Sequence, residues 1–111
     1  MDLQIKIENN VKVIAISGRL DAVTAPDYEK RIREMIDSGN SDFVVDFEQL
    51  DYISSAGLRA LLLMAKLLKE KGRQVCLANV KGNVRSVFEI SGFTKIFKIE
   101  ESIPAALAVL V

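Results

Sequence analysis

The residues best suited to chemistry are two adjacent serines, Ser54 and Ser55, which lie between a predicted buried strand and a predicted helix. In open α/β sheets, ligands and reactive groups gather at the carboxyl ends of strands. Backbone N–H groups at a helix start favour an anion, and a phosphoserine would bring about −1.5 to −2 charges there. A serine at such a position more commonly serves as the helix N-cap. The residues alone therefore leave two alternatives, a structural cap and a phosphorylation site.

Histidine is absent from the chain, and Cys76 is its only cysteine. The first absence excludes His-dependent triads, a histidine general base and His-containing metal sites. A single cysteine excludes an internal disulfide, a zinc knuckle and an iron–sulfur cluster, and we expect Cys76 to be a buried structural thiol. The glycine-rich loops that usually hold nucleotides do not occur. We therefore expect a binding module that uses no cofactor or metal, and not an enzyme.

Length and charge indicate one small domain over residues 1–111. The chain carries 15 basic and 15 acidic side chains, so no net field draws it to nucleic acid. The N-terminus lacks the basic start and apolar block of a signal peptide, and no apolar run approaches the roughly 20 residues that cross a bilayer. We expect a cytoplasmic protein that neither binds nucleic acid nor inserts into a membrane.

Hydrophobic periodicity predicts strands that alternate with helices. Two strands flank Asn9-Asn10, which predicts an antiparallel hairpin. Thr24 can cap the first helix, with Pro26 in its first turn and Gly39 at its end, and Ser102 can cap the last. Glycines should also end the second and third helices. The predicted strands cover residues 3–7, 11–17, 43–47, 75–78 and 96–99. The predicted helices cover residues 25–38, 54 or 55 to 71, 84–91 and 103–110.

This order, ββαβαβαβα, is typical of βαβ units with right-handed crossovers. We therefore expect a single α/β domain with a mostly parallel mixed sheet, an antiparallel first edge strand and about four helices. Asp21 follows the second strand, and its loop should lie beside the loop of Ser55. Asp21 could serve turn and capping chemistry there, or it could contact a partner.

The second predicted helix is unusually apolar. At about 100° per residue, its charged side chains share one narrow sector and apolar side chains cover nearly all the rest. An ordinary surface helix needs an apolar stripe only somewhat wider than about 100°. Neighbouring helices could bury the excess. Alternatively, Leu62, Leu63 and Arg59 could form a partner surface.

Four segments of the chain together resemble the STAS domain of bacterial anti-sigma-factor antagonists. The stretch Ser54-Ser55-Ala56-Gly57-Leu58 is similar to the motif Asp-Ser-(Ser/Thr)-Gly-Leu that opens the second helix of that family. The other matches lie before the first helix, in the central strand and at the end of the third helix. They are Gly18-Arg19-Leu20-Asp21 with Thr24-Ala25, Val44-Val45-Asp46-Phe47, and Ser91-Gly92-Phe93 with Ile96-Phe97. The resemblance covers nearly the whole chain.

The resemblance implies a switch controlled by phosphorylation. In the family, the unphosphorylated antagonist binds an anti-sigma factor that is also a serine kinase of the histidine-kinase-like ATPase type, and so frees the sigma factor. Phosphorylation of the motif serine, which matches Ser55 here, abolishes this binding, and a phosphatase would restore Ser55. The second choice for the modified residue is Ser54. The expected partner-binding residues are Asp21, Ser54, Ser55, Gly57, Arg59, Leu62 and Leu63.

Two positions of the motif differ from the family pattern. Ser54 stands where the family has Asp, and Ala56 stands where it has Ser or Thr. The first change removes a carboxylate that could contact the kinase, and it places two hydroxyls side by side. It also keeps open an alternative function, in which the chain is a constitutive STAS scaffold or small-ligand-binding module that is never phosphorylated.

Overall fold

A β-hairpin forms one edge of the sheet. In the computed structural model, which describes all residues from Met1 to Val111, β1 (Asp2–Glu8) pairs antiparallel with β2 (Val11–Leu20). Asn9 and Asn10 both have positive φ, 51° and 64°, which the tight turn of a two-residue hairpin requires and which asparagine tolerates. The predicted hairpin is confirmed.

The rest of the sheet is parallel, as expected. The strand order is β1-β2-β3-β5-β6, in which β3 (Phe43–Asp46), β5 (Val75–Ala78) and β6 (Lys98–Glu100) run parallel to one another, and β3 runs parallel to β2. A sixth strand, β4 (Leu50–Ile53), pairs with the second half of β2. The register along β2 shifts between Gly18 and Arg19, where pairing passes from β3 to β4.

Strand β4 was not predicted, so the observed order is ββαββαβαβα rather than ββαβαβαβα. The burial pattern of β4 explains why the sequence does not predict this strand. Leu50 and Ile53 are buried, whereas Asp51 and Tyr52 between them are exposed, so the segment shows neither alternation nor an apolar run. The prediction of a mostly parallel sheet with an antiparallel edge strand and four helices is confirmed.

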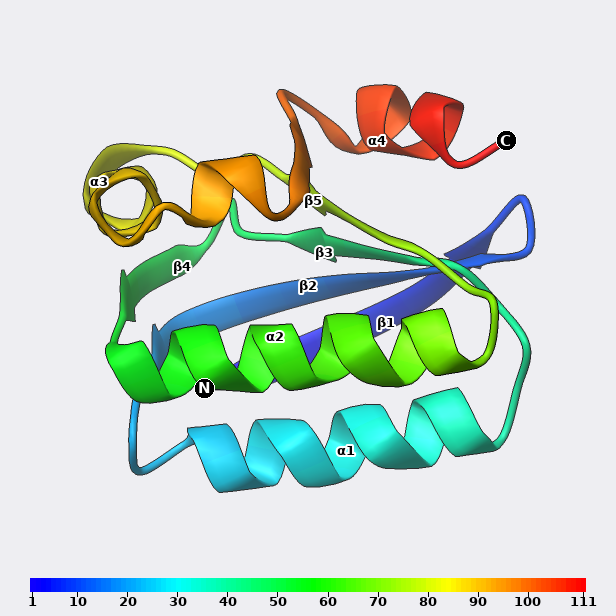
Figure 1. Cartoon of the computed structure of the whole chain (residues 1–111), viewed down its shortest axis with the longest axis horizontal. Helices are drawn as coiled ribbons and strands as arrows, with labels where there is room; N and C mark the ends of the chain where they lie inside the picture. Colours follow the sequence, from blue (N-terminus) through cyan, green and yellow to red (C-terminus); the bar gives the residue numbers. More distant parts are fainter.

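Helices cover both faces of the sheet (Figure 1). Helices α1 (Ala25–Asp37) and α2 (Ser55–Glu70) lie side by side on one face, and α4 (Ile103–Val109) covers the other. Helix α3 (Gly82–Ser91) packs against β4. The larger core lies between the sheet and helices α1, α2 and α3, and the smaller core lies beneath α4. None of the four helices has both the length and the apolar character that spanning a bilayer demands.

Several helix ends match the prediction. Gly72 follows α2 and Gly92 follows α3 with φ values of 71° and 79°, the left-handed conformation that glycine adopts at helix ends. The Ser102 hydroxyl accepts the backbone N–H of Ala105 at 3.2 Å and caps α4. Pro26 lies in the first turn of α1.

The boundaries of α1 agree with the prediction to within one residue, but its two predicted caps do not form. The Thr24 side chain makes no cap hydrogen bond to α1, because its hydroxyl donates to the Arg19 carbonyl at 2.9 Å and accepts the Asp21 N–H at 3.0 Å. Helix α1 ends at Asp37 with Ser38 as its C-cap, so Gly39 follows α1 at the same position at which Gly72 follows α2, but Gly39 has no positive φ. The Ser38 N–H donates to the Glu34 carbonyl.

The last strand begins later than predicted. It starts at Lys98, because a 3-10 turn, η1 (Phe93–Lys95), precedes it. The turn packs Phe93 and Phe97 against the buried ring of Phe88, at centroid distances of 6.1 and 6.5 Å. Ile96 points outward and is 58 % exposed. Within the predicted strand 96–99, Phe97 therefore packs against another aromatic ring, and only Lys98 and Ile99 pair with β5.

Candidate functional site

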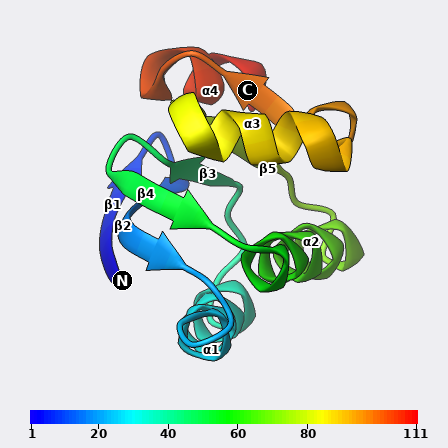
Figure 2. The ribbon, with the colours of Figure 1, turned by 90° about the vertical axis from the view of Figure 1, so that its left-hand side faces the viewer.

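The predicted site lies where two parallel strands end side by side. Leu20 at the end of β2 pairs with Ile53 at the end of β4, and the Ser54 N–H donates to the Leu20 carbonyl at 3.0 Å. The loop that carries Asp21 and the start of α2 therefore leave the sheet together, as Figure 2 shows for the blue and green arrows. The expectation that the Asp21 loop lies beside the Ser55 loop is confirmed.

The two adjacent serines have different environments. Ser55 is the first residue of α2, and it is exposed. Ser54 occupies the N-cap position in an extended conformation, but its side chain makes no cap hydrogen bond. Its hydroxyl oxygen is buried without any hydrogen-bond partner. The N-cap explanation for these hydroxyls is therefore wrong in this structure, and only the Ser55 hydroxyl is open to another molecule.

Gly57 holds the start of α2 against the sheet. It is buried, and a Cβ at this position would lie 2.6 Å from the Leu20 carbonyl oxygen and 2.8 Å from Cγ1 of Ile53. Because such distances are shorter than any real contact of a Cβ atom, only glycine allows the helix to approach this closely. The structure thus places Gly57 beneath the predicted surface, where it positions Ser54 and Ser55.

Asp21 organises the neighbouring loop. Its carboxylate accepts the backbone N–H groups of Val23 and Thr24 at 3.0 and 3.2 Å, and Arg19 Nε lies 3.4 Å from the other carboxylate oxygen. The hydrogen bond from the Thr24 N–H is the main reason that the pKa of Asp21 lies below its usual value. The turn-and-capping role considered for Asp21 is confirmed. A contact with a partner stays a prediction.

Arg19 and Tyr52 complete this surface, and sequence reasoning missed both. The two residues are paired across β2 and β4, and the Arg19 guanidinium lies 4.2 Å from the centre of the exposed Tyr52 ring, a cation–π arrangement. No sequence signal joins them, because their contact depends on β4, which has no periodic pattern.

The outward face of α2 begins at Ser55. At about 100° per residue, Ser55, Arg59, Leu62 and Lys66 fall within a sector of about 60°. Arg59 and Lys66 are exposed, whereas Leu62 and Leu63 are half-buried. Leu62 packs against the larger core, and Leu63 does not belong to that cluster. The sheet and neighbouring helices therefore bury most of the apolar side chains of α2. Of the two leucines, Leu63 has fewer core contacts.

Cys76 lies in the smaller core and is fully buried. Burial raises the pKa of its thiol to about 11, so the reactive thiolate is scarce at neutral pH. The prediction of a buried structural thiol is confirmed.

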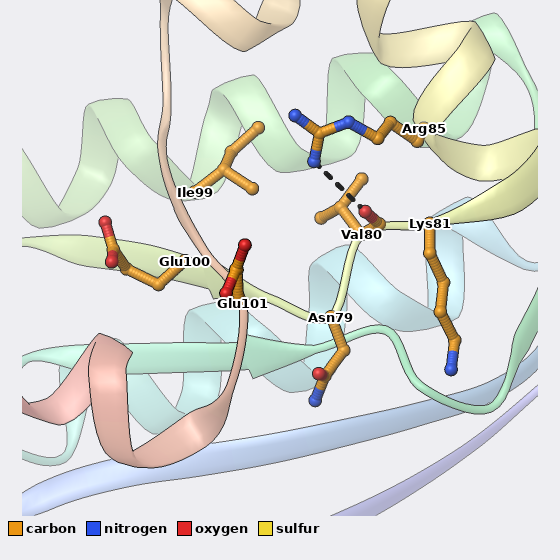
Figure 3. Close-up of a pocket in the computed structure, with 7 residues that line it drawn as sticks. All are labelled: Asn79, Val80, Lys81, Arg85, Ile99, Glu100 and Glu101. Carbon is orange, nitrogen blue, oxygen red and sulfur yellow. Dashed lines mark hydrogen bonds between the residues drawn. The ribbon is translucent and has the colours of Figure 1, made fainter.

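A separate cavity of about 440 Å³ lies at the carboxyl ends of β5 and β6 (Figure 3). Several of the polar groups around it already have partners. Lys81 pairs with Glu48 at 2.7 Å, and Arg85 donates to the Val80 carbonyl at 3.3 Å. The lining residues are Asn79, Val80, Lys81, Arg85, Ile99, Glu100 and Glu101. None of the predicted site residues is among them.

Comparison with known proteins identifies the family. The model of the STAS domain matches residues 2–106. The Bordetella bronchiseptica protein named "Putative anti-sigma factor antagonist BtrV" is 41 % identical over 96 residues, which are 86 % of this chain and 83 % of that protein. An anti-sigma factor antagonist from Mycobacterium paratuberculosis has a crystal structure with a TM-score of 0.84 and 26 % identity, over 98 % of this chain and 92 % of that one.

The fold is also that of the Bacillus cell fate determinant SpoIIAA, whose structure in the phosphorylated form aligns with a TM-score of 0.73 and 23 % identity. The alignment covers 97 % of this chain and 99 % of that one. Fold, motif order and sequence similarity agree over nearly the whole length. The chain therefore belongs to the STAS domain family, in the group of anti-sigma factor antagonists.

Proposed function

We propose that this chain is an anti-sigma factor antagonist switched by phosphorylation of Ser55. In its unphosphorylated form it binds an anti-sigma factor that is also a serine kinase of the histidine-kinase-like ATPase type, and this releases a sigma factor. Phosphorylation ends the binding, and a phosphatase restores the hydroxyl. The chain acts by binding and has no catalytic role of its own. The setting is the cytoplasm, which supplies the ATP.

The difference in exposure between the two adjacent serines is the observation that carries the proposal. A kinase must bring the γ-phosphate of ATP into line with the attacking hydroxyl oxygen. Ser55 is exposed at the start of α2, whereas the Ser54 hydroxyl oxygen is buried. Modification of Ser54 would first require its side chain to turn out of this buried position. This difference favours Ser55 over Ser54 as the modified residue.

The chain contributes only the nucleophile to the transfer. The Ser55 oxygen attacks the γ-phosphorus of kinase-bound ATP, and an oxygen–phosphorus bond forms as the bond from that phosphorus to the bridging oxygen of ADP breaks. The hydroxyl proton passes to a base of the kinase. The product carries about −1.5 to −2 charges beside the N–H groups of the first turn of α2, which tolerate them well.

Phosphopeptide mapping tests the assignment. A kinase recovered with the chain from native lysate is purified and incubated with the chain and ATP. We expect phosphate on the peptide that contains Ser55, no incorporation into the Ser55→Ala variant and normal incorporation into Ser54→Ala. Phosphate on Ser54, or phosphate elsewhere in the chain, contradicts the assignment. Stable binding without any phosphate incorporation favours the constitutive scaffold.

Phosphorylation should leave the fold almost unchanged. The modified side chain projects from an exposed position, and its charge meets the positive end of the α2 dipole. We therefore expect backbone amide shifts in NMR spectra to change only around residues 19–24 and 52–60. Shift changes that spread through β3 and β5 contradict a local switch.

Leu63 tests how far the partner surface extends along α2. Truncating a fully buried leucine costs roughly 2–5 kcal/mol of stability, but Leu63 is only half-buried and lies outside the core clusters. We expect Leu63→Ala to weaken kinase binding by about 1 kcal/mol or more with little change in melting temperature. Leu61→Ala is the matched control, because Leu61 is fully buried and its loss should lower the melting temperature. If Leu63→Ala lowers the melting temperature strongly and leaves the affinity normal, Leu63 belongs to the core and not to the partner surface.

A further inference from the structure

Arg59 lies one helical turn after Ser55 on the same outward face of α2. Both residues are exposed, and side chains four residues apart on a helix have Cβ atoms about 5–6 Å apart. Arg59 also lines a shallow hollow of about 380 Å³ between the starts of α1 and α2, together with Ala22, Ala25, Pro26, Glu29 and Ala56. The guanidinium therefore has open space in which to turn toward either Ser55 or a bound partner.

The Arg59 guanidinium has no partner within the chain. It takes part in none of the five ion pairs, although Glu29 lines the same hollow. On the other elements around Ser55, Arg19 is held by Asp21 and by the Tyr52 ring. Asp51 on β4 is exposed. Arg59 is thus the cation that is free to respond to a new charge on Ser55.

We propose that Arg59 captures the phosphate of phosphorylated Ser55, and that this capture is part of the release mechanism. This proposal rests on the proposed function, which supplies the phosphorylation of Ser55. In the unphosphorylated chain the guanidinium faces outward and is available to a carboxylate of the partner. After phosphorylation it forms charge-assisted hydrogen bonds to the phosphate oxygens one turn earlier. The partner surface therefore gains a dianion and loses a cation in the same event.

The order of the two residues suits this capture. An acidic group placed four residues before a basic one is the more favourable arrangement on a helix, because it agrees with the helix dipole. A phosphate also offers three acceptor oxygens to the planar guanidinium, which can bind them with two parallel N–H groups. Lys66, the next exposed cation along the same face, is about 16 Å away along the axis, beyond the screening length of about 8 Å at physiological ionic strength.

Phosphorus NMR measures the capture directly. Phosphoserine is incorporated at position 55 during synthesis of the full chain, so the test needs no kinase and does not depend on the proposed function. The second pKa of the phosphate is then followed by ³¹P titration at 0.15 M salt. Because Arg59 stabilises the dianion, we expect this pKa to be lower in the parent than in Arg59→Gln by about 0.3 unit or more.

Lys66→Gln is the matched control, since it removes the same charge from the same face of α2. We expect its phosphate to titrate as in the parent. Equal pKa values for the parent and Arg59→Gln overturn the proposal, and so does a shift in Lys66→Gln as large as that in Arg59→Gln. Either result leaves the Ser55 assignment standing. Failure to find phosphate on Ser55 in the kinase experiment would refute that assignment and, with it, the role of the capture in release, but not the capture that ³¹P NMR measures.

Discussion

Replacing Ser55 by aspartate should weaken binding to the proposed anti-sigma factor kinase about 100-fold, a loss of ~2.8 kcal/mol, whereas Ser55→Ala should bind as the parent does. Ser55 is exposed at the start of α2, within the partner surface that we propose. A carboxylate there must lose its water and meets the groups that accommodated a neutral hydroxyl, and both effects oppose binding. Isothermal titration calorimetry with the purified kinase measures the two affinities.

A negative charge elsewhere should have no such effect. Ser38 is exposed and follows the last residue of α1, at the opposite end of the helical layer from Ser55 (Figure 1). Ser38→Asp adds the same charge, and we expect parental affinity together with a small loss of stability of roughly 0.3–1 kcal/mol, because an acid at a helix C-terminus opposes the dipole. An unchanged affinity for Ser55→Asp, or an equal loss for Ser38→Asp, contradicts a switch at Ser55.

Most of the fold could be predicted from the sequence because most elements have a regular pattern. The alternation around Asn9-Asn10 predicts the hairpin, and the buried runs at 43–47 and 75–78 predict parallel strands that the structure confirms. Strand β4 could not be predicted, because its pairing with β2 leaves Asp51 and Tyr52 exposed. Its stability comes from hydrogen bonds to a distant segment, which a local pattern does not reveal.

The same limit applies to the site. The motif identifies the start of α2, but it does not distinguish the two hydroxyls. That difference arises in three dimensions, where the Ser54 N–H bonds to the Leu20 carbonyl and the Ser54 hydroxyl is buried as a consequence of the packing. The pairing of Arg19 with Tyr52 likewise depends on the register of β2 and β4. Sequence patterns locate the loop, and tertiary contacts decide which side chains it presents.

Gly57→Ala should be the most destabilising single-methyl change near the site. Its new Cβ would lie 2.6 Å from the Leu20 carbonyl oxygen and 2.8 Å from Cγ1 of Ile53. The first of these atoms belongs to the backbone of β2, so the start of α2 must move away. Overpacking of this kind costs about 1–3 kcal/mol, and the better helix propensity of alanine offsets up to about 1 kcal/mol. We expect a melting temperature several degrees below that of the parent, measured by calorimetry.

The same displacement should weaken kinase binding, because Ser55 lies two residues before Gly57 and moves with it. Gly39→Ala separates this effect from that of glycine replacement in general. Gly39 has no positive φ, and the nearest atom to its added Cβ is the flexible end of Lys12, Nζ, at 3.1 Å, so a small shift of that side chain relieves the contact. We expect Gly39→Ala to keep both the melting temperature and the affinity of the parent. If Gly57→Ala melts and binds as Gly39→Ala does, the close approach of α2 to β2 is not what positions Ser55.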